Sequence, residues 1–271
     1  MADDEPCAAC SWTQERRESC RYKSHIKLFY EMGDRGVWAI VRNTQFIRHH
    51  TTVPVPETVQ EWSENDRYFL VMKRVPGSTL HELWPSMSES EKDSIAKQTV
   101  DYLGQLRKLH SNSVESLGGG PVYSAFLFCN GYGLPHGPCS SDDQLWKEMA
   151  KALSEVPENA RHQLQQRMPM AKPYTFTHGD LATRNIMVSN GKVTGIIDWE
   201  NSGFFPVWWE FVAARISHDD DDRAWKALLR KRMEDYTDAL EFWLDYDALS
   251  SYPDLESRGK RLIEDSESRS G

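Results

Sequence analysis

The stretch that most restricts how this chain can fold runs from a short strand, through a polar loop, into a tight hairpin. Residues 174–177 (YTFT) have the length and composition of a strand. Residues 186–189 and 192–197 predict two further strands, joined by Asn190-Gly191, a dipeptide typical of two-residue hairpin turns. The loop of residues 178–185 is therefore held at both ends, which predicts fixed positions for its side chains.

Polar side chains along this stretch indicate phosphoryl transfer. His178, Asp180 and Asn185 lie on the loop, and Asp198 follows the last strand of the hairpin. A carboxylate on a rigid loop can accept the proton of a hydroxyl group that attacks phosphorus, so Asp180 is the candidate base. An amide oxygen and a carboxylate suit Mg²⁺, so Asn185 and Asp198 are the candidate metal ligands. Because this reaction depends mainly on alignment and charge neutralisation, the set predicts phosphoryl transfer.

The segment HGDLATRN (residues 178–185), followed by a hairpin that ends in IDW (residues 197–199), resembles the catalytic and metal loops of the aminoglycoside phosphotransferase and choline kinase-like family. Both segments are closest to a fungal branch of that family, and the resemblance extends over residues 25–266. It implies an α+β, bilobal protein-kinase-like fold with a small, truncated β-rich N-lobe and a large, mainly helical C-lobe. It also implies ATP and Mg²⁺ as cofactors, and a small-molecule hydroxyl group as acceptor.

The resemblance also implies roles for individual residues. Asp180 resembles the family's catalytic base, and Asn185 and Asp198 resemble its metal ligands. His178 resembles the histidine that braces the catalytic loop. Glu210 falls where the family often has an acidic residue that supports this loop, so we expect a supporting role for it.

The same resemblance predicts how the chain is divided. The expected parts are a flexible tail (1–24), an N-lobe with the phosphate loop and hinge strand (25–75), a helical C-lobe with the catalytic and metal loops (76–266), and a short tail (267–271).

The predicted nucleotide site has two parts in the N-lobe. Gly33 and Gly36 resemble the loop that covers the phosphates of ATP, in a turn between strands expected at 26–30 and 37–41. The apolar run 68–75 predicts a strand that leads into the hinge between the lobes. The candidate contacts to adenine are the backbone groups of Met72, Arg74 and Val75.

The lysine that grips ATP in this family, and the glutamate that orients it, are not visible here. The sequence has no lysine between Val37 and Met72, and no acidic residue between Val37 and Val53. Three interpretations remain open: an incomplete gene model or splice variant of an active kinase, a chain with weakened or lost ATP chemistry, or a working kinase in which Arg42 or Lys27 replaces the lysine.

Helical patterns dominate the remainder. Residues 91–110 repeat apolar side chains at steps of three and four, and Ser88 with Glu91 fits a capping box. Residues 111–140 are rich in Gly, Pro and aromatics, which predicts a long loop of the kind that often binds ligands. The acidic run 219–222 predicts a solvated loop. Further helices are expected at 43–49, 141–153 and 160–168, and in a segment with Trp225, Leu228, Leu229, Met233 and Tyr236 on one face.

The amino-acid composition limits the kinds of molecule that the protein is expected to bind. A net charge of −9 and a pI of about 5.5 argue against nucleic acid, since a phosphate backbone requires a basic surface. The acidic balance is compatible with a cationic or neutral small substrate. The N-terminus lacks the apolar core of a signal peptide, and no apolar run reaches membrane-spanning length, so we expect a cytoplasmic protein without a membrane partner. The sequence leaves the oligomeric state open.

These observations predict an ATP-dependent phosphotransferase that acts on a hydroxyl of a small molecule, with Asp180 as base. The alternative is a catalytically impaired kinase-fold protein that binds or regulates, because the ATP-gripping lysine is missing. A protein kinase is a weaker interpretation, since no Ala-Pro-Glu-like segment follows Asp198.

Overall fold

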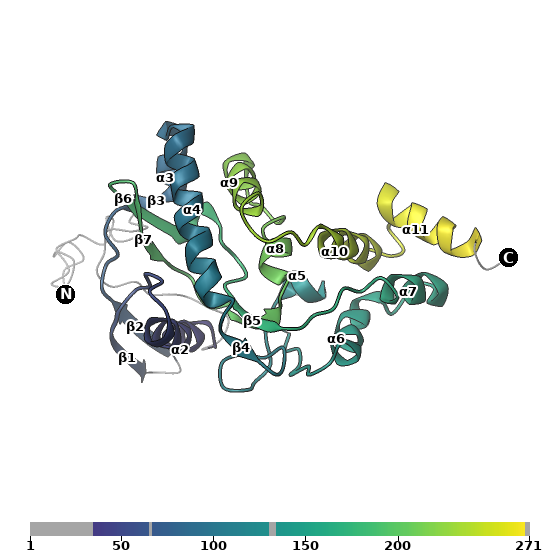
Figure 1. The fold of residues 1–271 in the computed structure, drawn as a ribbon. Coiled ribbons are helices and arrows are strands. Elements are labelled where there is room, and N and C mark those ends of the chain that lie inside the picture. The colour runs from purple at the N-terminus through teal and green to yellow at the C-terminus, as the bar shows by residue number, and fades with distance from the viewer. Residues whose placement is uncertain (1–34, 65–66, 130–133, 269–271) are drawn as a thin grey trace, which may run out of the picture.

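The computed structural model describes residues 35–64, 67–129 and 134–268. These residues form an α+β chain of small antiparallel sheets and many helices (Figure 1). The predicted tail 1–24, the predicted strand 26–30 and the candidate phosphate residue Gly33 lie outside the described residues, as does Lys27.

The first described element is a helix, α2 (Arg35–His50), so the prediction of a strand at 37–41 is wrong. Five apolar residues in a row fit a strand and a buried helix equally well, and only the longer pattern separates the two. Ile40, Asn43 and Ile47 are buried at helical spacing, which lays one face of α2 against the protein. The helix expected at 43–49 is confirmed as the second half of α2.

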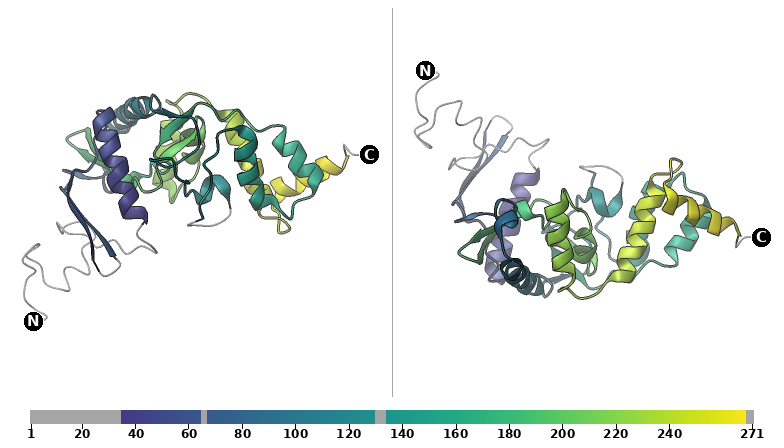
Figure 2. Two further views of the ribbon diagram at one scale, coloured as in Figure 1. Left: turned by 90° about the horizontal axis from the view of Figure 1, so that it is seen from below. Right: turned by 90° about the horizontal axis from the view of Figure 1, so that it is seen from above.

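Two strands follow α2 and form a hairpin. β1 (Thr58–Glu64) pairs antiparallel with β2 (Arg67–Met72), and α2 lies alongside them in both views of Figure 2. The strand predicted at 68–75 is thus confirmed as far as Met72. Beyond that point, the amide of Lys73 still donates to the carbonyl of Glu57 at 2.8 Å, and the chain then leaves the sheet.

The segment after β2 is fastened to the central hairpin of the molecule. The hydroxyl of Thr194 donates to the carbonyl of Pro76 at 2.6 Å. Gly77 has a φ of +102°, and a Cβ added there would lie 2.1 Å from the carbonyl oxygen of Val188. Only glycine fits here, for two reasons. Any other residue would be strained in the left-handed backbone conformation, and its side chain would clash with the neighbouring strand.

Replacing Gly77 by alanine should lower the free energy of unfolding by at least about 2 kcal/mol, from backbone strain plus the clash with Val188. Urea titration followed by tryptophan fluorescence measures the change. Gly104→Ala is the matched control: a Cβ at this helical site meets nothing within 4 Å, so it should raise stability by about 0.5–1 kcal/mol. Equal unfolding midpoints for the two variants would contradict the argument.

Helices make up most of the chain beyond Gly77. α4 (Glu89–Leu106) confirms the helix expected at 91–110, and the capping box of Ser88 and Glu91 is present. The helices expected at 141–153 and 160–168 are found within one to three residues at most ends. The remaining elements of this part are α3 (Leu80–Leu83), α5 (Ala125–Phe128), α6 (Asp142–Met149), the 3-10 turns η1 (Trp84–Ser86) and η2 (Ala150–Leu153), and α7 (Glu158–Gln165).

The predicted long loop folds back on itself. Isolated bridges join Val114 to Cys139 and Val122 to His136, and the short helix α5 lies between their arms. The ring of His136 stacks on Phe128 at 3.8 Å between centroids. The loop therefore has its own local core.

Two three-stranded antiparallel sheets hold the loop of residues 178–185 at its two ends. β6 (Ile186–Ser189) and β7 (Lys192–Ile196) form the predicted hairpin, with β3 (Ser78–Thr79) at its edge. Asn190 and Gly191 have φ values of 50° and 71°, as the predicted two-residue turn requires. The second sheet orders β4 (His110–Ser111), β5 (Tyr174–Thr177) and β8 (Gly203–Pro206). β5 confirms its prediction, whereas β8 was not predicted, because its run of four residues is bounded by Gly and Pro.

The C-terminal third is helical. α8 (Trp209–Ala213), α9 (Asp220–Arg230), α10 (Thr237–Ser250) and α11 (Ser257–Ser268) follow one another, and α11 lies at the end of the molecule remote from β1 and β2 (Figure 1). Met233 and Tyr236, expected on the same helix as Trp225, lie beyond the end of α9. Four tryptophans are almost completely buried in the core: Trp199, Trp208, Trp209 and Trp225. Over the described ranges, no helix combines the length and the apolar character needed to cross a bilayer.

Candidate active site

His178 anchors the loop between β5 and β6. Its side chain is fully buried, and Nε2 lies 3.0 Å from the carbonyl oxygen of Ile197. The amide of Asp180 donates to Nδ1 at 3.2 Å. Nδ1 must therefore be the unprotonated nitrogen and Nε2 the donor. Burial lowers the pKa of His178 to about 4, which keeps the ring neutral. The contacts are those of a bracing residue.

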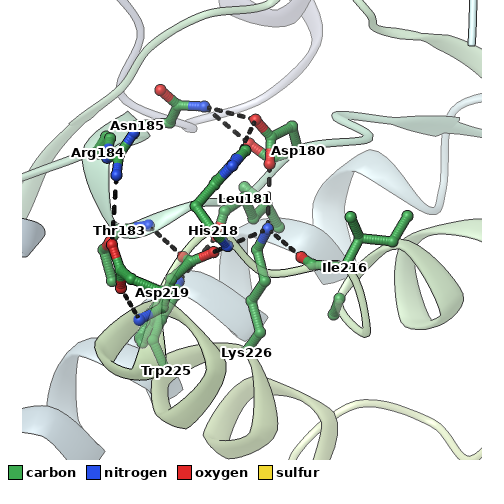
Figure 3. Close-up of polar contacts among 12 residues, drawn as sticks. Asp180, Leu181, Thr183, Arg184, Asn185, Ile216, His218, Asp219, Trp225 and Lys226 are labelled. Atoms are coloured by element: carbon green, nitrogen blue, oxygen red, sulfur yellow. Dashed lines mark hydrogen bonds and ion pairs between the residues drawn. The ribbon is translucent and has the colours of Figure 1, made fainter. Parts of the chain in front are cut away.

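Asn185 ends the short 3-10 turn η3 (Thr183–Asn185) and folds back over Asp180. Its Nδ2 donates to the carbonyl of Asp180 at 3.0 Å and lies 3.4 Å from Oδ2 of the Asp180 carboxylate. The amide oxygen of Asn185 points away from Asp180 (Figure 3). The Asp180 side chain keeps 28% of its surface exposed, so a small molecule can reach it.

Asp198 follows a residue that is bonded twice to the same loop. The amide of Ile197 donates to the carbonyl of Asn185 at 2.9 Å, and its own carbonyl receives the bond from His178. Asp198 then adopts a φ of 67°, a left-handed conformation that turns the chain sharply, and it is exposed. The ring of Trp199 packs on His178 at 4.5 Å between centroids. The structure thus brings the backbones of Asn185 and Asp198 together.

Helix α2 reaches this turn through one buried side chain. Nδ2 of Asn43 donates to the carbonyl of Trp199 at 2.8 Å and to that of Ser202 at 3.3 Å. Asn43 is only 2% exposed, so these bonds compete little with water. The position of α2 is therefore coupled to the turn that carries Asp198.

Glu210, on α8, lies beneath the loop. Its carboxylate accepts hydrogen bonds from the amides of His178 at 2.7 Å and Gly179 at 3.3 Å. Burial raises the pKa of Glu210 to about 7, despite these two bonds. The predicted supporting contact is present.

The buried pair of Glu210 and His178 predicts a specific pH dependence of stability. The folded-state pKa of Glu210, about 7, exceeds its ordinary 4.5, so its contribution is full below pH 4.5 and lost as the pH rises through 7. The folded-state pKa of His178, about 4, lies below its ordinary 6.5, so its contribution is present above pH 6.5 and lost as the pH falls through 4. Between these limits the two slopes oppose each other.

Glu210→Gln removes one slope and leaves the other. On acidification from pH 6.5 to 4.5, the variant should lose stability relative to wild type by up to about 1.4 kcal/mol per pH unit. Urea unfolding at three pH values measures this difference, with the exposed Glu256→Gln as control. Parallel curves for wild type and Glu210→Gln would show that the pKa of Glu210 is not raised in the folded protein.

One face of α9 also binds the loop of residues 178–185, in addition to Glu210 on α8. The sequence did not predict these contacts. Oδ1 of Asp222 accepts from the amide of Thr183 at 2.8 Å, and the indole of Trp225 donates to the carbonyl of Leu181 at 2.8 Å. Nζ of Lys226 lies 3.1 Å from Oδ1 of Asp180 (Figure 3).

The acidic run at 219–222 is therefore not a solvated loop. Asp219 caps the N-terminus of α9 by accepting from the amide of Asp222, and Asp222 itself is 1% exposed. A signal was present in the sequence: Asp222, Trp225 and Lys226 share one helical face, and a lysine beside a core tryptophan requires a buried partner.

The residues present fit Mg²⁺. Asn185 supplies an amide oxygen turned away from Asp180, and Asp198 supplies a carboxylate on the adjoining turn. Mg²⁺ typically takes one or two such protein ligands and completes its shell with water and phosphate oxygens. No group of three or more His, Cys, Asp or Glu side chains within the described ranges could hold a metal unaided. A nucleotide would have to supply the remaining ligands.

The candidate nucleotide residues lie at and just after the end of β2. Met72 ends β2, Arg74 is exposed, and Val75 covers Gly195 on β7. A cavity of about 440 Å³ lies beside them, and its lining includes no residue of the catalytic loop. Its lining includes Arg48, Glu57, Lys73, Arg74, Val75 and Thr194.

Gly36 and Arg42 are placed differently from the sequence expectation. Gly36 lies in the first turn of α2, not in a turn between two strands. The guanidinium of Arg42, also on α2, faces the 111–140 loop, since a Cβ added at Gly118 would lie 3.2 Å from it.

Comparisons with solved structures place the fold. The chain matches the streptomycin–ATP–APH(2")-IIa ternary complex with a TM-score of 0.50 at 13% identity, over 86% of this chain and 80% of the other. It matches the ADP-bound aminoglycoside phosphotransferase APH(2'')-Ib with a TM-score of 0.51 at 15% identity, over the same shares of both chains. The fold is therefore protein-kinase-like, as predicted.

Sequence comparison identifies the family. Human acyl-CoA dehydrogenase family member 11 is 28% identical over 160 residues, which cover 55% of this chain and 19% of the human protein, so the match involves about a fifth of that relative. The profile of the phosphotransferase enzyme family (APH) matches residues 39–246, most of the chain and the whole of the site built above. The chain belongs to this phosphotransferase family.

Proposed function

We propose that this protein transfers the terminal phosphoryl group of ATP to a hydroxyl of a small molecule, with Asp180 as the catalytic base. One observation supports this most: Asp180 has a partly exposed carboxylate and is itself bonded to His178, Asn185 and Lys226. A carboxylate that is fixed in this way, on the same loop system as the two candidate Mg²⁺ ligands Asn185 and Asp198, is suited to aligning an attacking hydroxyl.

The residues would divide the work as follows. Asp180 orients the acceptor hydroxyl and takes its proton. Asn185 and Asp198 would hold Mg²⁺, which in bound form neutralises charge on the phosphates. His178 and Glu210 act through the backbone of the loop, since neither side chain is exposed.

The nucleotide would bind between two lobes, with the boundary after residue 75. We propose backbone contacts to adenine at Met72, Arg74 and Val75, and phosphate contacts at Gly33 and Gly36. Two of the solved neighbours contain ATP or ADP, which supports nucleotide use. The acceptor is a small molecule, and the net charge of −9 favours a cationic one over nucleic acid. No membrane partner is proposed.

A second candidate is a family member that binds nucleotide or acceptor without turnover. The observation in its favour is the sequence of α2, which contains neither lysine nor an acidic residue. The side chain of α2 that contacts the turn after Asp198 is the neutral Asn43. The lysine–glutamate pair expected of an active kinase therefore has no counterpart in this helix.

Two measurements on the full chain decide between these functions. The first is calorimetric titration with ATP in the presence and absence of Mg²⁺. The second is ADP release with a panel of amino alcohols, aminoglycosides and sugars. Magnesium-dependent binding with acceptor-stimulated ADP release supports the phosphotransferase. ATP binding without any release across the panel supports the second candidate. The absence of ATP binding contradicts the phosphotransferase and the nucleotide-binding form of the second candidate.

A further inference from the structure

Lys226 is a charged residue in the protein core, where a lysine is not expected. It lies on α9, is only 2% exposed, and has Trp225 as its neighbour in the core. Burying an ammonium group is costly unless its charge and its hydrogens are matched. Its partners therefore indicate why the fold retains it.

Nζ of Lys226 donates two hydrogen bonds and makes one further ion pair. It lies 2.7 Å from the carbonyl oxygen of Ile216, 3.1 Å from Oδ1 of Asp180 and 3.3 Å from Oδ2 of Asp222. An ammonium group has three N–H donors. Two of these donors bind the carbonyl of Ile216 and the carboxylate of Asp180, so the lysine is built to hold the base.

The two oxygens of the Asp180 carboxylate are consequently different. Oδ1 is bound by the buried ammonium group of Lys226. Among the described residues, the contacts of Oδ2 are longer: 3.4 Å to Nδ2 of Asn185 and 3.8 Å to Nε2 of His218. His218 is 42% exposed and extends toward Asp180 (Figure 3). Of the two oxygens, Oδ2 is the one with room for a hydroxyl group.

We propose that Lys226 is a positioning residue for catalysis, which fixes Oδ1 of Asp180 so that Oδ2 receives the proton of the acceptor. In this step the acceptor oxygen bonds to the γ-phosphorus, the bond from that phosphorus to the leaving oxygen of ADP breaks, and the hydroxyl proton moves to Oδ2. The inference rests on the proposed function. It adds which atom acts as base and which residue outside the loop aims it.

A test must separate this role from simple charge balance. Lys226→Met leaves Asp222, which is 1% exposed, without its cation, and that alone can impair folding. Lys226→Met combined with Asp222→Asn removes both charges, and the asparagine oxygen can still accept from the amide of Thr183. In this double variant only Asp180 has lost an ionic partner. Lys231→Met, at the exposed C-cap of the same helix, is the matched control.

We expect kcat to fall by about 10- to 100-fold in the double variant, because a displaced catalytic group loses alignment. The KM values for ATP and for the acceptor should stay within about threefold of wild type, because the buried Lys226 holds Asp180 and does not bind either substrate in this proposal. Unfolding midpoints of the double variant and the control establish that both are folded. Lys231→Met should match wild type in all three constants.

Several results would overturn the inference. Recovery of wild-type kcat in the double variant would show that Lys226 only neutralises Asp222. An increase in the KM for ATP at unchanged kcat would indicate a phosphate contact instead of a positioning role. An inactive wild-type chain would remove both the inference and the proposed function, whereas an active wild type with an equally active double variant would remove the inference alone.

Discussion

Replacement of Asp180 by asparagine should lower kcat by about 10³-fold, within the range of 10²- to 10⁴-fold typical of losing a general base. Asparagine keeps the shape of the side chain and can still be approached by Lys226, but its amide does not accept a proton from an attacking hydroxyl. Because the acceptor and ATP keep their other contacts, their KM values should change little.

The measurement is steady-state ADP release with the best acceptor from the panel, at saturating Mg²⁺. Asp220→Asn is the control, since the Asp220 side chain is 90% exposed on the first turn of α9 and forms an ion pair with Arg223 on the same helix. Unfolding of Asp180→Asn must be measured as well, because the variant changes the charge beside buried Lys226. Wild-type kcat in a folded Asp180→Asn protein would exclude Asp180 as base.

Replacement of Asp198 by asparagine should lower kcat by about 10²-fold and raise the Mg²⁺ concentration needed for half-maximal activity. The effect follows from the loss of an anionic oxygen on the turn that adjoins Asn185. Asparagine is the informative substitution here, because the φ of Asp198 is 67° and asparagine tolerates this left-handed conformation. The charge can thus be removed without straining the turn.

Asp198→Ala provides the comparison that isolates backbone strain. Alanine removes the same charge but should also cost about 1–2 kcal/mol of stability in the left-handed conformation. Magnesium titrations of ATP binding by calorimetry should shift equally in the two variants, while only Asp198→Ala should unfold at lower urea. An unchanged magnesium requirement in Asp198→Asn would remove Asp198 from the metal site.

The catalytic segment was predictable because its structure is set locally. Asn190-Gly191 forces a two-residue turn, the turn sets the register of β6 and β7, and the register places Ile197 beside Asn185. Spacing along the chain therefore translates directly into proximity in space. The capping box of Ser88 and Glu91 was predictable for the same reason, since both partners lie within one turn of α4.

The prediction failed where a short pattern had two solutions. Residues 37–41 suit a strand as well as a helix, and the buried stripe of Ile40, Asn43 and Ile47 decided for α2. Asn43 illustrates the difficulty, because a buried asparagine weakens the apolar pattern. Asn43 can be buried because its amide donates to the carbonyls of Trp199 and Ser202, which lie more than 150 positions away in the chain.

The sequence by itself determined the hairpin that holds the candidate catalytic loop and the family to which the chain belongs. The hairpin follows from contacts between residues close together in the chain, and the family follows from the order of residues along it. Only the tertiary structure decided that Lys226 reaches Asp180, 46 positions away, and that Asp222 and Glu210 hold the same loop from two helices. The physical reason is that desolvation and three-dimensional geometry decide which groups can pair with a buried charge. The spacing of residues along the chain predicts neither of them.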